Sequence, residues 1–279
     1  MRLFRIVAVG TAMLCWATAA LIGATASDDT TAASASRLTA TVELRRIPGD
    51  DRVLAIAVEN HGDHPITVIG AELATDSFTP TGLLPVEVTV PVGAIRDVFI
   101  AYGRGICGDE LSPTAAPATA RLLLTDRQRV DLALPHPDGT LDRLLATDCA
   151  AAYLDRTVSI AFRDWDTDSD GRLRANLELT RVGGAEPFRL DRLSGNPHFD
   201  LTVVATAEPV AILDGRDDRM TVPVVVDVDC DAHNLAEAKQ PFRFPLWLTV
   251  GDRVAIPTTI PVTTSDIAHL ETLRTRRCG

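Results

Sequence analysis

From residue 38 to the C-terminus, apolar and polar residues alternate in short segments, and turn-forming residues separate one segment from the next. Alternation with a period of two over four to eight residues is typical of half-buried β-strands. The first half of the chain predicts strands at 39–44, 53–59, 66–73, 86–90, 97–102, 118–124 and 129–134. The second half predicts them at 157–162, 172–180, 188–193, 201–206, 220–229, 242–249 and 254–260. The pattern therefore predicts an all-β protein.

Turn residues recur every eight to twelve residues between these segments, and a short helical stretch at 140–146 follows the first set. About seven short strands with such turns resemble the immunoglobulin-like β-sandwich in architecture, although no family motif covers the chain. We expect two tandem domains of this kind, at 38–155 and 156–279, each ending in a short helix. Because 150–156 contains no glycine or proline, we expect a fixed arrangement of the two domains.

The two halves also match locally. The run of residues 122–125, followed by Arg129 and Val130, has the spacing of 246–249 followed by Arg253 and Val254. Similarly, Leu141, Leu144 and Cys149 have the spacing of Leu270, Leu273 and Cys278. Matches in the same order favour a duplicated domain over one large sandwich.

Apart from Cys15, which lies in the hydrophobic N-terminal run, the chain has four cysteines, and four cysteines allow three pairings. The duplication selects one disulfide per repeat, Cys107–Cys149 and Cys230–Cys278. Each would close a loop of about 40–50 residues, and closing such a loop stabilises a fold by about 4 kcal/mol in the chain-entropy model. Disulfides are typical of exported proteins.

The N-terminus carries Arg2 and Arg5 before an uncharged apolar run at 6–26. This pattern predicts an export signal that forms one hydrophobic helix. Ala24-Thr25-Ala26 fits a cleavage site, but the run is also long enough to remain as a membrane anchor. The Ser-, Thr- and Ala-rich segment 27–37 predicts a flexible linker. We therefore expect the protein on the extracellular side of the cell membrane, secreted or anchored.

The formal net charge is −11, which argues against nucleic acid and against an anionic membrane surface as partners. Any contact with the membrane would come through residues 1–26. Lys239 is the one lysine of the chain, so lysine Schiff-base chemistry and P-loop phosphate binding have little support.

The sharpest local signal is Asp166-Thr167-Asp168-Ser169-Asp170-Gly171. Three carboxylates at alternate positions before a glycine fit a calcium loop, with Asp166, Asp168 and Asp170 as ligands. An EF-hand would need Glu where Leu177 stands, and the flanks are predicted strands. The alternative is a solvated acidic turn, because Asp-Gly favours a tight hairpin. Apart from calcium, no cofactor is predicted.

Other candidate residues are weaker. His61 and His64 flank a turn and lack a second pair of zinc ligands, so we interpret them as turn residues. Residues 274–277 form a basic cluster, which suits a helix C-terminus or, alternatively, an acidic partner. We expect Trp247 in the core and Trp165 exposed beside the acidic turn.

No nucleophile motif of the G-x-S-x-G type is present, and no particular pair of carboxylates stands out. The leading hypothesis is an exported bacterial envelope protein that serves binding, adhesion or assembly without catalysis, with an envelope protein or a glycan as partner. The alternative is a secreted hydrolase with a carboxylate site between the two domains.

Overall fold

The computed structural model describes residues 37–45, 52–108, 110–204, 208–231, 240–253 and 255–279. The predicted signal or anchor at 1–26 and nearly all of the predicted linker lie outside these ranges. Within the described ranges, neither helix is long and apolar enough to cross a membrane.

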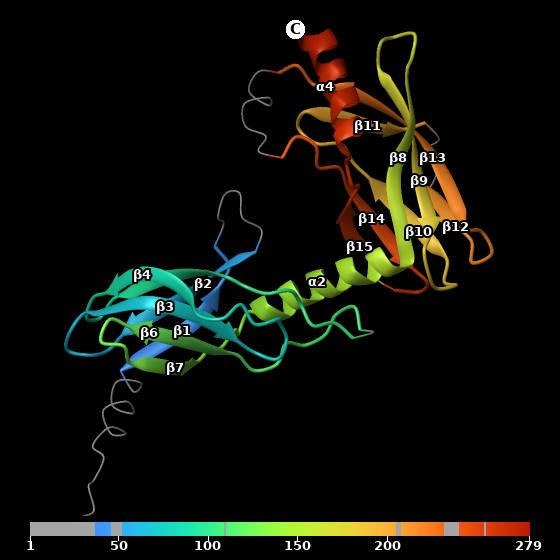
Figure 1. Cartoon of the computed structure of the whole chain (residues 1–279). Helices are drawn as coiled ribbons and strands as arrows, with labels where there is room; N and C mark the ends of the chain where they lie inside the picture. The colour runs from blue at the N-terminus through green and yellow to red at the C-terminus, as the bar shows by residue number, and fades with distance from the viewer. Residues whose placement is uncertain (1–36, 46–51, 109, 205–207, 232–239, 254) are drawn as a thin grey trace, which may run out of the picture.

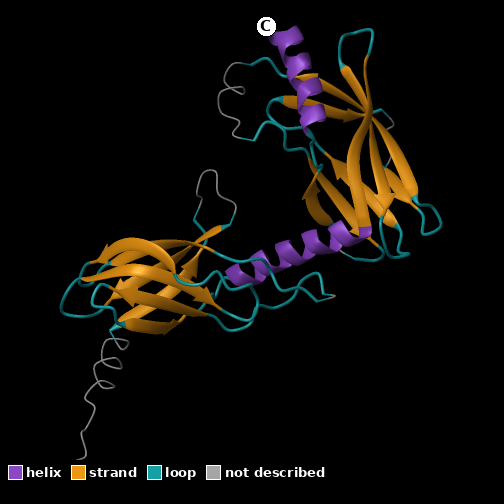
Figure 2. Ribbon diagram, viewed as in Figure 1, coloured by secondary structure: helices purple, strands orange, loops and turns teal. Residues whose placement is uncertain are grey.

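The described chain is mostly antiparallel β-sheet, with two helices (Figure 1 and Figure 2). Its elements in the first part are β1 (Leu38–Glu43), β2 (Val53–Asn60), β3 (Ile66–Ala74), β4 (Leu84–Val90), β5 (Ile95–Ala101), β6 (Thr119–Leu124), β7 (Arg129–Ala133) and α2 (Thr140–Thr157). The remaining elements are β8 (Val158–Thr167), β9 (Leu173–Arg181), β10 (Phe188–Leu193), β11 (Phe199–Val203), β12 (Ala211–Leu213), β13 (Arg219–Val228), β14 (Pro245–Val250), β15 (Ile256–Thr259) and α4 (Thr264–Cys278). The predicted all-β class is confirmed.

Two sheets enclose each of two hydrophobic cores, which gives a β-sandwich-like arrangement. The first core lies between the sheets β1-β2-β5 and β4-β3-β6-β7. The second lies between β11-β13-β9-β8 and β12-β10-β14-β15. The alternating strands put their apolar residues inward, as in β1, where buried and exposed positions alternate along Leu38–Glu43.

The order of the strands is the same around both cores. In each, the first strand pairs with the second, and the second also pairs with the strand that precedes the first cysteine of a disulfide, β5 or β13. The third strand, β3 or β10, pairs on one side with the first of the two strands that precede the helix, which in turn pairs with the second, and on its other side with β4 or β12. The second set adds β11 beside β13. β12 was not predicted because its three residues are too few to display alternation.

Helix α2 corrects the predicted helix at 140–146, because it continues to Thr157 through the expected domain boundary. Leu141, Leu145 and Cys149 are spaced by four, so they lie on one helix face, and all three belong to the first core. Ala150 and Leu154 are also spaced by four, and they lie on a face about 100° around the helix from Cys149. This face packs against the second core, where Leu154 is buried. The helix is continuous because it has buried contacts at both of its ends.

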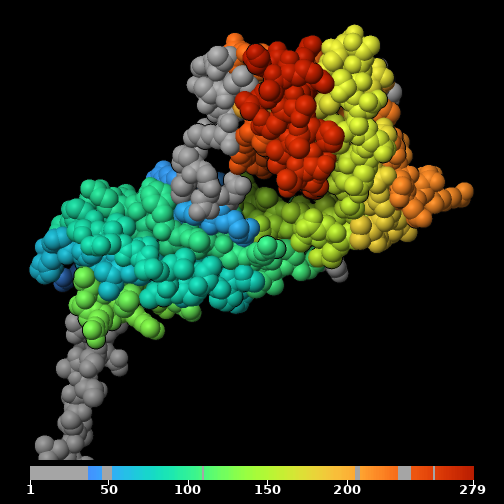
Figure 3. Space-filling model, turned by 45° about the horizontal axis from the view of Figure 1, so that its top comes forward, coloured from blue at the N-terminus to red at the C-terminus, as the bar shows by residue number. Residues whose placement is uncertain are grey.

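The second helix, α4, begins with a capping box in which Thr263 and Asp266 exchange hydrogen bonds. Leu270 and Leu273 are fully buried in the second core. The space-filling view shows α4 lying against the hairpin of β8 and β9 (Figure 3). α4 thus covers the second core as the first half of α2 covers the first.

A proline in the exposed middle of α2 tests whether the helix must be continuous. Ala151 is exposed, so Ala151→Pro acts through the backbone, removing one helical hydrogen bond and adding a steric clash. We expect the free energy of unfolding in urea to fall by about 3 kcal/mol, against about 1 kcal/mol for the control Ala151→Gly. Equal losses for the two variants would contradict a continuous helix at this point.

Candidate functional site

The two disulfides join the predicted pairs, with Cα–Cα distances of 5.3 Å for Cys107–Cys149 and 5.4 Å for Cys230–Cys278. In each, a cysteine in the segment after β5 or β13 is bonded to a cysteine of a helix, α2 or α4. All four cysteines of the described residues are therefore bonded in disulfides, and none of them is a free thiol.

An ion pair beside the first disulfide ties α2 to the start of β2. Both carboxylate oxygens of Asp148 accept from Arg52 at 2.9 Å, and one of them also accepts the Gly105 N–H at 2.6 Å. The Arg52 guanidinium also lies over the Tyr102 ring, 4.6 Å from its centre. Burial alone would raise the pKa of Asp148, but the bonds from Arg52 and Gly105 outweigh it and hold that pKa below its ordinary value.

Beside the second disulfide, arginines make the equivalent tie. Arg276 donates to the carbonyl of Gly171 at 2.6 Å, and Arg277 donates to the carbonyl of Asp170 at 3.2 Å and to the Asp227 carboxylate at 3.3 Å. Arg277 precedes Cys278 as Asp148 precedes Cys149. Two arginines of the basic cluster at 274–277 therefore bind the acidic turn of their own chain, while the third, Arg274, pairs with Glu271.

In the acidic turn, the three predicted calcium ligands have different partners. The Asp168 side chain is 2% exposed and accepts from the N–H groups of Asp170 and Arg172 and from the Arg172 guanidinium. These bonds outweigh burial and lower the pKa of Asp168. The Asp170 carboxylate pairs with Arg172 at 2.9 Å, and Asp166 accepts the N–H of Thr167. Gly171 has a φ of 79°, which suits glycine in this turn.

Within the described residues, no group of three or more His, Cys, Asp or Glu side chains is arranged to hold a metal ion. Calcium at Asp166, Asp168 and Asp170 stays a prediction from the sequence. In this structure the ion would have to displace Arg172.

The predicted histidine and tryptophan residues have structural partners. His61 lies 3.1 Å from the Thr39 hydroxyl, and His64 pairs with Asp63 at 3.2 Å, in a turn that the Asn60 side chain bridges.

The prediction that Trp165 is exposed is wrong, because its indole N–H donates to Asp266 at 2.7 Å and its ring stacks on His269. The expectation that Trp247 lies in the core is also wrong, because Trp247 is half-buried on the sheet surface under Arg192.

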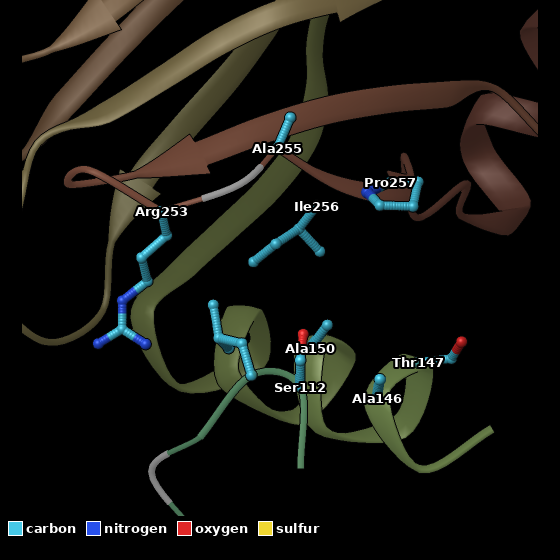
Figure 4. Close-up of a pocket in the computed structure, with 9 residues that line it drawn as sticks. Ser112, Ala146, Thr147, Ala150, Arg253, Ala255, Ile256 and Pro257 are labelled. Atoms are coloured by element: carbon cyan, nitrogen blue, oxygen red, sulfur yellow. The ribbon is translucent and has the colours of Figure 1, made fainter. Parts of the chain in front are cut away.

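A hollowed surface lies between α2 and β15, and we call it the α2–β15 groove (Figure 4). It consists of two adjoining cavities of about 340 Å³ and 720 Å³, which share Thr147 and Pro257 in their linings. The α2 wall has only small side chains, and the opposite wall is β15 with the residues before it. The described lining of the first cavity is Leu111, Ser112, Ala146, Thr147, Ala150, Arg253, Ala255, Ile256 and Pro257. The second adds Ala151, Gly195, Asn196, Pro197, Gln240, Arg243, Pro245, Thr258 and Thr259.

The charged residues among the described lining are Arg253 in the first cavity and Arg243 in the second. Arg253 stacks over Tyr153 and lies 3.9 Å from Glu186, so its charge is partly neutralised. Burial and the hydrogen bond to Glu186, 2.8 Å long, raise the pKa of Tyr153. Arg243 donates to the side-chain oxygen of Gln240 at 2.9 Å.

The chemistry of this lining is suited to binding. The described lining contains four hydroxyls, from Ser112, Thr147, Thr258 and Thr259, among mostly apolar atoms, and no carboxylate, His or Cys that would act as a base or nucleophile. The sequence did not reveal the groove, because alanines in a helix and a four-residue strand look the same whether they line a cavity or pack in a core.

Comparison with known proteins gives no family. No family model matches the chain, and no curated protein matches it. Among solved structures, red sea bream transglutaminase aligns with 82% of this chain and 31% of its own, at 14% identity and a TM-score of 0.26. CBD12 from CALX1.2 aligns with 80% of this chain and 82% of its own, at 12% identity and a TM-score of 0.20. The chain thus spans about a third of that transglutaminase, and both likenesses are too weak to carry an argument.

The ion pair of Arg52 and Asp148 predicts a pH dependence of stability. The pKa of Asp148 is lower in the folded chain than the ordinary value near 3.9, so its contribution is complete above about pH 4 and is lost as the pH falls through the folded pKa. We expect Asp148→Asn to lower the free energy of unfolding by about 1–2 kcal/mol at pH 7. The difference from the wild-type chain should shrink in acid, and an unchanged difference at pH 2 would contradict this assignment.

Calcium at the acidic turn predicts competition with Arg172. Thermal unfolding with and without millimolar calcium is the measurement, in the wild-type chain and in Arg172→Gln. If the predicted ligands bind calcium, Tm rises, and it rises more in Arg172→Gln because the competing guanidinium is gone. No rise in either protein would remove calcium from consideration.

Proposed function

We propose that the chain is an exported protein of a bacterial envelope that binds another envelope protein without catalysing a reaction. In this proposal two tandem immunoglobulin-like domains, 38–155 and 156–279, form the body of the protein. Residues 1–26 direct export and are then cleaved or kept as an anchor. Two disulfides, which persist in oxidising compartments, support this location.

The observation that carries the proposal is the lining of the α2–β15 groove. The described lining is apolar and cationic, with Arg243 and Arg253 as its charges, in a chain of net charge −11. An apolar concave surface with a few placed polar groups is typical of a binding site. Its two cavities contain no aromatic side chain among the described lining residues, which favours a protein over a glycan as the partner.

The alternative of a hydrolase receives no support from the groove. Glycoside hydrolysis requires two carboxyl groups on opposite sides of the scissile bond, and the described lining provides none.

Photo-crosslinking in intact cells tests the proposal. Thr147 is exposed and lines both cavities, so Thr147→p-benzoylphenylalanine places the reactive group at the centre of the groove. Thr272 of α4 is the matched control, because it is also an exposed helical threonine whose hydroxyl bonds to the carbonyl four residues earlier. We expect an adduct of defined mass at 147 that is absent at 272 and disappears in Arg243→Gln. Identical products at both positions, or turnover of an envelope glycan by the purified chain, would overturn the proposal.

A further inference from the structure

We propose that the occupant of the α2–β15 groove is an extended, acidic segment of the partner protein, which adds as a strand to the free edge of β15. This inference rests on the proposed function and names the chemistry of the partner at the same site. Three observations support it: an open sheet edge, a wall of small side chains opposite that edge, and the charge of the lining.

The edge is open because β15 pairs with β14 on one side only and ends its sheet. The N–H of Ile260 donates to the carbonyl of Phe244, the residue directly before β14, at 2.9 Å. The main-chain N–H and C=O groups of Ile260 therefore face the β14 side of the strand. Main-chain groups of alternate residues point to the same side of a strand. Ile256 and Thr258 therefore also point toward β14, while Pro257 and Thr259 point to the free edge.

The free edge offers two carbonyl oxygens, from Pro257 and Thr259, and one N–H, from Thr259. Apart from contacts within its own sheet, no described element makes a main-chain hydrogen bond to Pro257 or Thr259. Pro257 fits the edge position because it has no N–H to lose. A peptide strand at this edge would make up to three main-chain hydrogen bonds, as in recognition by β-strand addition.

The space beside the edge suits a strand. An added strand lies about 4.8 Å from its neighbour, and bulky side chains opposite would prevent its entry. The α2 wall presents Ala146, Thr147, Ala150 and Ala151, which are among the smallest side chains. Figure 4 shows β15 and α2 on opposite sides of the cavity.

Charge selects an acidic segment. Arg253 lines the first cavity and Arg243 the second, with Thr147 and Pro257 shared between them, so cationic groups lie toward both ends of the groove. Asn196 holds the Arg243 segment in place by donating to the carbonyls of Pro241 and Arg243. Arg243 is the stronger anchor, because Glu186 partly neutralises Arg253. An anionic amphiphile would satisfy the arginines but would leave the donors and acceptors of β15 unpaired, so the peptide is favoured.

A defined peptide tests this mode of binding on the full chain. The probe is the heptapeptide acetyl-Glu-Thr-Val-Thr-Val-Thr-Glu-amide, and the readout is the amide NMR signal of Thr259 together with the dissociation constant. A version with Gln in place of both Glu tests charge, and a version N-methylated at its five inner residues tests main-chain bonding. Sodium dodecanoate is the amphiphile probe.

We expect the acidic peptide to shift the Thr259 amide signal and slow its hydrogen exchange. The Gln version should bind about fivefold more weakly, since a charge-assisted bond is lost, and the N-methylated version at least about tenfold more weakly. Arg243→Gln should weaken binding of the acidic peptide alone, whereas Arg129→Gln, which removes an exposed arginine of β7, should change nothing. Thr147→Trp should block binding, and Thr272→Trp should leave it intact.

Equal binding of the N-methylated peptide, or tighter binding of dodecanoate with no effect on the Thr259 amide, would overturn strand addition. If the crosslink at position 147 persists in that case, the groove keeps its binding function and only the peptide mode fails. If the crosslink is also absent, the proposed function itself fails.

Discussion

The continuous helix α2 is the constraint on which the rest of the structure depends. One helix places Leu141, Leu145 and Cys149 in the first core and Leu154 in the second. Burying a leucine stabilises a fold by about 1.5–3 kcal/mol, so unwinding either end of the helix would lose at least one such contact. Because α2 is rigid between the two cores, it also forms a fixed wall opposite β15, and the groove exists only because this wall is fixed.

Helices α2 and α4 are attached to their cores in the same way. A disulfide joins each helix to the segment that follows β5 or β13, and an ion pair or charged hydrogen bond joins the residue before the helix cysteine to the first hairpin of the same core. The sign of the charge differs, Asp148 in α2 and Arg277 in α4. Either sign can hold a helix to a turn if the hairpin supplies the complementary group.

The groove and the acidic turn represent two uses of polar residues. In the turn, Asp168 and Asp170 are engaged by Arg172, and the carbonyls of Asp170 and Gly171 by arginines of α4, so charge there serves packing. In the groove, Arg243 bonds to Gln240 and no carboxylate is among the described lining residues. Two arginines with no carboxylate among the described lining concentrate positive potential at this surface, which is the sign that the proposed acidic partner requires.

The sequence by itself determined the all-β class, most strand positions and the pairing of the four cysteines. Alternation is visible within each short segment, and internal repetition is visible when the two halves of the chain are compared. It failed where the decision depended on neighbours distant in the chain. Helix α2 extends past residue 146 because Leu154 finds a second core, and Trp165 is covered because Asp266 and His269 lie beside it. The groove was decided only by the tertiary structure, since an alanine lines a cavity or fills a core according to what stands opposite it.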